Sequence, residues 1–114
     1  TNDAQPNLQQ YNGNFATDYI QLIRHFENLP TKPTIWLVKP PPIFGIGNGL
    51  STDRLNQEIL PGIDAVAKKT GLPVIDIYSL FINRPDCFPY DGVHPNDAAI
   101  TLITCEIFKI FKIK

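Results

Sequence analysis

The sequence lacks the features that direct a protein to nucleic acid or to a membrane. Its ten basic and eleven acidic residues leave a net charge of −1 at pH 7, which is too little positive charge for a nucleic-acid backbone or an anionic lipid surface. No apolar stretch approaches the roughly 20 residues of a membrane span, and no signal-peptide pattern opens the chain. We therefore expect neither nucleic acid nor a membrane as a partner, and the compartment stays open.

Methionine is absent and cysteine is scarce. Because the chain opens abruptly at Thr1 in a polar segment and holds no methionine, we expect it to be a fragment or a trimmed product. Cys87 and Cys105 fit no metal-ligand spacing such as Cys-x-x-Cys, so no metal site is expected. A disulfide between them stays open, but the pattern favours two small buried hydrophobic side chains.

What the chain does contain is typical of one globular domain, or of part of one. Its 114 residues are 43% hydrophobic and 18% charged, which is the composition of a folded chain and not of a disordered one. A chain of this length buries roughly two-thirds of its unfolded surface, enough for a modest core.

Hydrophobic spacing predicts alternating helices and strands. Apolar residues that recur every three or four positions predict three amphipathic helices, which cover Tyr19–Phe26, Leu55–Ala67 and Ala99–Ile110. Two short apolar runs, Thr34–Val38 and Val74–Tyr78, predict strands that are buried on both faces, as in a parallel sheet. This order predicts an α/β layer fold with parallel strands.

The ends of these helices carry capping signals. Polar residues at the three helix starts are expected to act as N-caps: Thr17 or Asp18, Ser51 or Thr52, and Asn96 or Asp97. Gly71 stands where a helix C-terminus favours glycine. Pro61 falls inside the second helix, so we expect either a kink or two shorter helices there.

Two strands are few for a parallel sheet. A parallel pair alone leaves two unpaired edges, which natural proteins avoid. The pattern therefore indicates that further strands precede Thr1 in the parent protein, or that another chain supplies them.

The segment Asp91–Asn96 carries the clearest chemical signal. His94 precedes a proline, which favours an extended backbone and a place on a loop at a helix start. Loops after the carboxyl ends of parallel strands are where α/β sheets bind ligands. Asp91, three residues earlier across a glycine, is near enough to accept a hydrogen bond from one imidazole nitrogen. The other nitrogen is then free to take a proton, as in a general base held by an orienting acid.

A plainer interpretation of the same segment is that Asp91 caps the last helix and His94 only hydrogen-bonds nearby. Asn96 or Asp97 is better placed for the cap, so the balance favours the functional interpretation. His25, on the polar side of the first helix, is interpreted as a solvated residue. Asp76, near a strand end, is interpreted as a structural carboxylate.

The run Asp-Gly-Val-His-Pro-Asn at 91–96 resembles the last signature block of the SGNH (GDSL-type) hydrolase family. At the other end, Thr1-Asn2-Asp3 resembles the tail of the family's Gly-x-Asn-Asp block. The resemblance implies a three-layer α/β/α, flavodoxin-like fold with a parallel sheet, of which residues 1–114 are the C-terminal part of one domain. It also implies that Asn2 donates to an oxyanion hole, and that Asp91 and His94 are the acid and the base of a Ser-His-Asp triad. No cofactor is implied.

Within this family, the run from Phe88 to Asn96 and the segment near Pro61 resemble acylhydrolases of carbohydrate-degrading bacteria. That resemblance implies a small-molecule or carbohydrate ester as the substrate and removal of acetyl groups as the reaction, in a family that is often exported. Pro41 and Phe44, in the loop after the first predicted strand, and Val93 are expected to contact the substrate.

The family's nucleophile is missing from the sequence. It sits in a Gly-Asp-Ser block ahead of the asparagine block, and neither that block nor the second, glycine-bearing block is present. The only serines, Ser51 and Ser79, lie in neither a Gly-Asp-Ser nor a Gly-x-Ser-x-Gly context, so neither is expected to be the nucleophile. We expect the N-terminal portion of the same domain to be the chain's partner. The alternatives are a non-catalytic α/β binding module and an inactive fragment.

Overall fold

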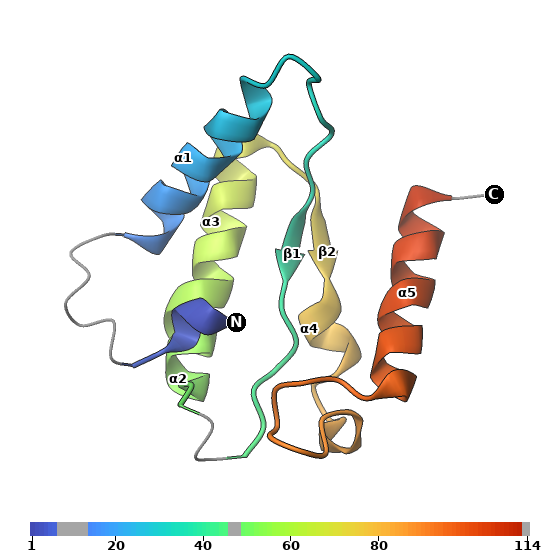
Figure 1. Ribbon diagram of the computed structural model, residues 1–114. Helices are drawn as coiled ribbons and strands as arrows, with labels where there is room; N and C mark the ends of the chain where they lie inside the picture. The colour runs from blue at the N-terminus through green and yellow to red at the C-terminus, as the bar shows by residue number, and fades with distance from the viewer. Residues whose placement is uncertain (7–13, 46–48, 113–114) are drawn as a thin grey trace.

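The computed structural model describes residues 1–6, 14–45 and 49–112, in which helices and strands alternate along the chain (Figure 1). In chain order, these elements are the 3-10 turn η1 (Asn2–Ala4), α1 (Phe15–Glu27), β1 (Leu37–Lys39), α2 (Thr52–Arg54), the π-helical turn η3 (Leu55–Ile59), α3 (Leu60–Thr70), β2 (Val74–Asp76), α4 (Ile77–Leu80), the 3-10 turn η4 (Pro85–Cys87) and α5 (Asp97–Phe111).

The two strands pair in parallel, as predicted. Their register, from one end of the ladder to the other, is Leu37 with Val74, Val38 with Ile75, and Lys39 with Asp76. Within the described ranges β1 pairs with β2 alone, so each strand keeps one edge without a strand neighbour.

The predicted bounds of both strands are wrong in part. The second was expected to run on to Tyr78, but the Asp76 carboxylate accepts a hydrogen bond from the N–H of Ser79 (3.0 Å), and this N-cap starts α4 at Ile77. The first strand is Leu37–Lys39 and not Thr34–Val38, because in this parallel register residues 34–36 would lie opposite residues 71–73, which precede β2.

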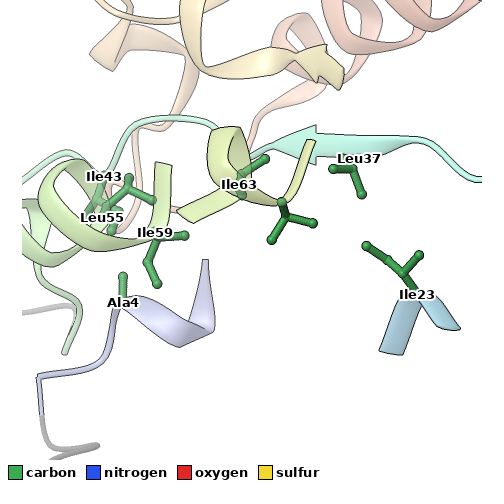
Figure 2. Packing of buried hydrophobic residues seen from close by; sticks show 8 residues of the cluster. Ala4, Ile23, Leu37, Ile43, Leu55, Ile59 and Ile63 are labelled. Carbon is green, nitrogen blue, oxygen red and sulfur yellow. The ribbon is translucent and has the colours of Figure 1, made fainter. Parts of the chain in front are cut away.

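Side chains on the two faces of the sheet enter two separate hydrophobic clusters. Leu37 packs with buried residues of α1 and α3 (Figure 2). Val74 packs against the same cluster. Trp36 and Ile75 pack instead with residues of α4 and α5, including Ala99. Helices therefore cover both faces of the sheet, with α1 and α3 on one side and α5 on the other (Figure 1). The α/β fold class with a parallel sheet and three layers is confirmed.

Most of the predicted caps are present. The Ser51 hydroxyl accepts from the N–H of Arg54 (3.1 Å) at the start of α2, and the Asn96 side chain accepts from the N–H of Ala99 (3.0 Å) at the start of α5. Gly71 ends α3 with φ +73°, in the left-handed region. The cap of α1 was predicted wrongly: it is Asn14, whose side chain accepts from the N–H of Thr17 (3.1 Å).

Pro61 produces a widened turn in one helical run, and not two separate helices. The π-helical turn η3 joins α2 to α3, and the N–H of Leu60 bonds to the carbonyl of Leu55, five residues back. Proline has no N–H to donate and its ring crowds the carbonyl of the residue four positions earlier. A wider turn at this point relieves that crowding.

The two cysteines differ in their surroundings, and both are free. Cys87 is fully buried in the second cluster, as predicted. Cys105 is exposed on α5, so its predicted burial is wrong: it lies on the face of that helix turned away from the sheet.

Candidate active site

Asp91 and His94 form a compact pair in the loop before α5. One carboxylate oxygen of Asp91, Oδ1, accepts from the N–H groups of Val93 (2.9 Å) and His94 (2.8 Å). The other, Oδ2, lies 2.5 Å from the imidazole Nδ1 of His94. The loop that separates the two residues is thus folded around the carboxylate, and the imidazole is held by it.

This contact decides how the imidazole is protonated. An ionised carboxylate only accepts hydrogen bonds, so Nδ1 carries the proton and the neutral ring keeps an unprotonated Nε2. The side chain of His94 is 80% exposed. Nε2 is therefore oriented, accessible and free to take a proton from a neighbouring group.

The surroundings of Asp91 keep its carboxylate ionised. The backbone N–H of His94, the imidazole and the N–H of Val93, in that order of weight, together hold the pKa of Asp91 well below its ordinary value. Each of these hydrogen bonds favours the charged form. The carboxylate is thus negative at neutral pH.

The lowered pKa of Asp91 predicts a pH-dependent contribution to stability. Because the folded-state pKa lies below the unfolded value of about 3.9, the contribution is complete above that pH and is lost as the pH falls toward the folded-state pKa. Urea unfolding of the protein and of Asp91→Asn, from pH 7 down to pH 2.5, should give midpoints that converge in acid. A difference between the two midpoints that stays constant from pH 7 to pH 2.5 would contradict this prediction.

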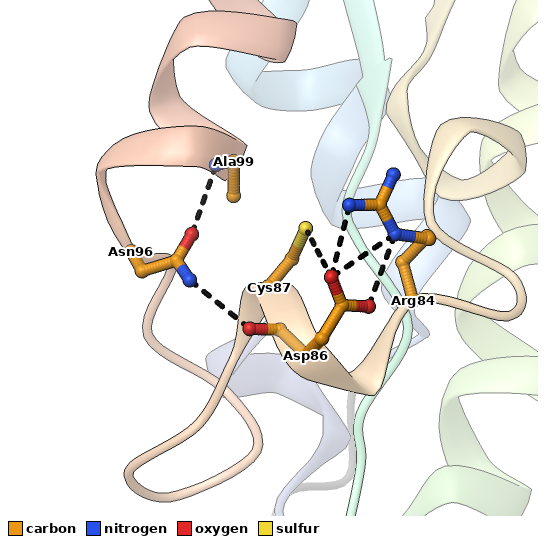
Figure 3. A network of polar contacts seen from close by, with 5 residues as sticks. All are labelled: Arg84, Asp86, Cys87, Asn96 and Ala99. Atoms are coloured by element: carbon orange, nitrogen blue, oxygen red, sulfur yellow. Dashed lines mark hydrogen bonds and ion pairs between the residues drawn. The ribbon is translucent and has the colours of Figure 1, made fainter.

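Main-chain bonds close the loop that carries the pair. The N–H of Gly92 donates to the carbonyl of Phe88 (3.2 Å), and the N–H of Asn96 donates to the carbonyl of Cys87 (2.9 Å). The Asn96 side chain has two roles, since its amide nitrogen also donates to the carbonyl of Asp86 (3.0 Å) (Figure 3). Asn96 therefore anchors both ends of the loop to the start of α5.

An ion pair that the sequence analysis missed lies at the base of this loop. The Arg84 guanidinium binds both oxygens of the Asp86 carboxylate, with Nη2 2.9 Å from Oδ2 and Nε 3.0 Å from Oδ1 (Figure 3). The pair is exposed, so its contribution to stability is small. The spacing Arg-x-Asp was the available signal, but such pairs are too common on surfaces to be singled out.

The other predicted site residues lie on three different segments. Asn2 is exposed on η1. Pro41 and Phe44 follow β1; the Phe44 ring is half-buried against Phe88, with ring centroids 5.5 Å apart. Val93 is half-buried against the first cluster, to which Ala4, two residues after Asn2, also belongs. Phe44 thus contacts the loop of the Asp91–His94 pair, to which Val93 itself belongs, whereas the hydrogen bond described for Asn2 lies within its own turn.

Ser51 caps a helix, His25 is exposed and Asp76 has a structural role, as predicted. The Ser79 hydroxyl donates to Asp76 Oδ2 (2.7 Å), so this bond adds to the N-cap that Asp76 forms at the start of α4. Ser51 caps α2. His25 is exposed on α1.

A hollow on the described surface lies away from the Asp91–His94 pair. It has a volume of about 900 Å³ and is bounded by η1, α1, β1 and α3, with Phe15, Tyr19, Val38 and Pro40 among its lining residues. Val38 itself is 43% exposed. β1 and the residue after it, Pro40, therefore form part of the wall of this hollow.

Neither a metal site nor a membrane span is found in the parts of the chain that the structure describes. No three His, Cys, Asp or Glu side chains are grouped there so as to hold a metal ion. No helix in these ranges is long and apolar enough to cross a bilayer.

Comparison with known proteins finds two esterases to which this chain is similar. No protein-family model matches it. Over 85% of its length it is 31% identical to the acetylxylan esterase of Xylanibacter ruminicola, of which it covers 24%. Its fold matches the esterase domain of the ZfL2-1 ORF1 protein from the zebrafish ZfL2-1 retrotransposon with a TM-score of 0.71 and 25% identity, over 84% of this chain and 56% of that one.

The chain thus spans about a quarter of the length of the curated relative and little more than half of the solved domain. Both matches agree with the resemblance that the sequence blocks at the two ends indicate. In sequence and in fold, this chain is similar to part of an esterase.

Proposed function

We propose that this chain supplies the general base and the orienting acid of a serine ester hydrolase that removes acetyl groups from a carbohydrate. The observation that carries the proposal is the Asp91–His94 pair, with Oδ2 2.5 Å from Nδ1 and an exposed imidazole. The resemblance to SGNH hydrolases supports the reaction. The bacterial relative, an acetylxylan esterase, supports the substrate class.

In this proposal a serine from outside these 114 residues attacks the acyl carbonyl, and Nε2 of His94 takes the serine proton. Asp91 holds the ring through Nδ1 and stabilises the imidazolium that forms. His94 then returns the proton to the departing sugar hydroxyl, and water releases acetate from the serine by the same two transfers. No step requires a cofactor.

Asn2 is proposed to donate its side-chain amide to the oxyanion of the tetrahedral intermediate. Its exposed position on η1 leaves the amide free to meet a substrate. Removal of one such donor typically lowers turnover by about 10²–10³-fold. Pro41, Phe44 and Val93 are proposed to contact the acyl or sugar group.

The serine-bearing portion of the domain is proposed to dock along β1. Three observations support this site: β1 has an edge without a strand neighbour, Val38 of β1 lines the 900 Å³ hollow, and Leu22 of α1, which also lines the hollow, is 53% exposed. The solved esterase domain is also longer than the part that this chain matches. We call the chain together with this portion the assembled esterase.

The proposal predicts that a serine-reactive phosphonate labels a serine other than the two present here. The test is the intact mass of the purified protein, with p-nitrophenyl acetate hydrolysis measured before and after labelling. A labelled, active assembly with unlabelled Ser51 and Ser79 supports the proposal. Ser79→Ala serves as a control and should change neither labelling nor turnover, since its hydroxyl is bonded to Asp76.

Two outcomes would contradict the proposal. Label on Ser79 in this chain would make that serine the nucleophile. A complete protein that shows no turnover and no label would favour a non-catalytic module that keeps the fold for binding.

A further inference from the structure

Gly92, between Asp91 and His94, lies in direct main-chain contact with the loop after β1. Its φ is +75°, and a Cβ built on it would lie 1.7 Å from the carbonyl oxygen of Phe44, 2.5 Å from the carbonyl carbon and 3.2 Å from Cα. All three are backbone atoms, so no side-chain rotation could make room. Only a residue without a side chain fits while the two loops keep this separation.

A hydrogen bond joins the same two segments. The N–H of Phe44 donates to the carbonyl of Gly92 (2.9 Å). The Phe44 ring packs on Phe88, which in turn meets Phe81 edge-on at 5.3 Å between ring centroids. Phe81 and Phe88 are buried in the second cluster, so the partner of Gly92 is anchored in the core.

The contact lies where the Asp91–His94 pair is most sensitive to movement. The two N–H groups that bind Asp91 Oδ1 belong to Val93 and His94, the residues directly after Gly92. A shift of Gly92 away from Phe44 would move these donors and the imidazole together. In catalysis, a misplacement of about 1 Å can lower the rate roughly 10²-fold.

We infer that Gly92 is a positioning residue. Because it has no side chain, its backbone packs directly on the main chain of Phe44, and this contact fixes the Asp91–His94 pair against the loop that follows β1. The inference rests on the proposed function for its effect on turnover. The geometric part, that Gly92 holds the pair together, stands without it.

The chain offers a matched control for the test. Gly71 has φ +73°, almost the same backbone conformation as Gly92, but nothing lies within 4 Å of a Cβ built on it. Gly71→Ala therefore introduces the strain of an alanine in the left-handed region without the collision. Any effect of Gly92→Ala beyond that of Gly71→Ala comes from the contact with Phe44.

The test compares Gly92→Ala, Gly71→Ala and the unmodified protein by two readouts. Proton NMR reports the strongly downfield Nδ1–H resonance of an imidazole bonded to a carboxylate, and steady-state kinetics of the assembled esterase reports kcat and KM. Gly92→Ala should lose the resonance and lower kcat about 10²-fold with little change in KM. Gly71→Ala should keep both.

A Gly92→Ala protein that keeps the downfield resonance and near-normal kcat would overturn the inference. Gly92→Asn is the second variant, to be used if Gly92→Ala does not fold. Asparagine tolerates a left-handed backbone better than alanine yet still carries a Cβ. If both variants fail to fold while Gly71→Ala folds, the glycine is merely structural and the inference is also overturned. A resonance lost in Gly92→Ala, in a protein with no esterase activity, would support the positioning role and contradict the proposed function alone.

Discussion

Replacement of His94 with alanine should lower kcat of the assembled esterase by roughly 10²–10⁴-fold, the usual contribution of a general base. The variant has no group that can take the serine proton at this point of the loop. Its fold should be almost unchanged, because the imidazole is 80% exposed and leaves no buried cavity. The two backbone bonds to Asp91 Oδ1 also remain, since neither uses the imidazole.

The measurement is kcat for p-nitrophenyl acetate, with circular dichroism to check the fold. His25→Ala is the matched control, because it removes the other histidine, exposed on α1, and should leave turnover intact. Near-normal turnover in His94→Ala would refute the assignment of the general base.

Asp91→Asn should lower kcat by about 10⁴-fold, as expected for loss of the carboxylate that orients a catalytic histidine. The asparagine oxygen can keep the bonds to the N–H groups of Val93 and His94. Its NH₂ group then faces Nδ1 and donates to it. The imidazole is thereby held with its proton on Nε2, the nitrogen that has to accept the serine proton.

Asp86→Asn is the control for this variant. It changes another exposed carboxylate at the base of the same loop, one that pairs with Arg84 and not with His94. Asp86→Asn should keep kcat within a few-fold of the unmodified enzyme. If Asp91→Asn kept kcat to the same extent, His94 would not depend on the Asp91 carboxylate.

Much of the fold follows from local rules, such as helix capping, that can be recognised in the sequence. Gly71 and Asn96 end and start helices as predicted, because each satisfies a backbone requirement by itself. The predictions failed where two local rules compete. Ile77 and Tyr78 have the apolar and aromatic character of strand residues, yet the cap formed by Asp76 turns them into a helix.

The candidate site divides in the same way. The Asp91–His94 contact spans three residues across a glycine, so spacing alone could indicate it. The packing contact between Gly92 and Phe44 could not be predicted, because it joins two segments that are distant in sequence. It involves backbone atoms and leaves no side-chain pattern. The same holds for the exposure of Cys105, which depends on which face of α5 meets the sheet.

The open edge of β1 also bears on how this chain behaves in a test tube. Unpaired backbone groups at a sheet edge attract other strands, and in a concentrated sample the nearest strand is that of an identical molecule. Lys39, whose charge could discourage such stacking, is tied to Asp64 of α3 at 2.8 Å. We therefore expect the chain to be more soluble when it is produced together with the serine-bearing portion proposed to dock along β1.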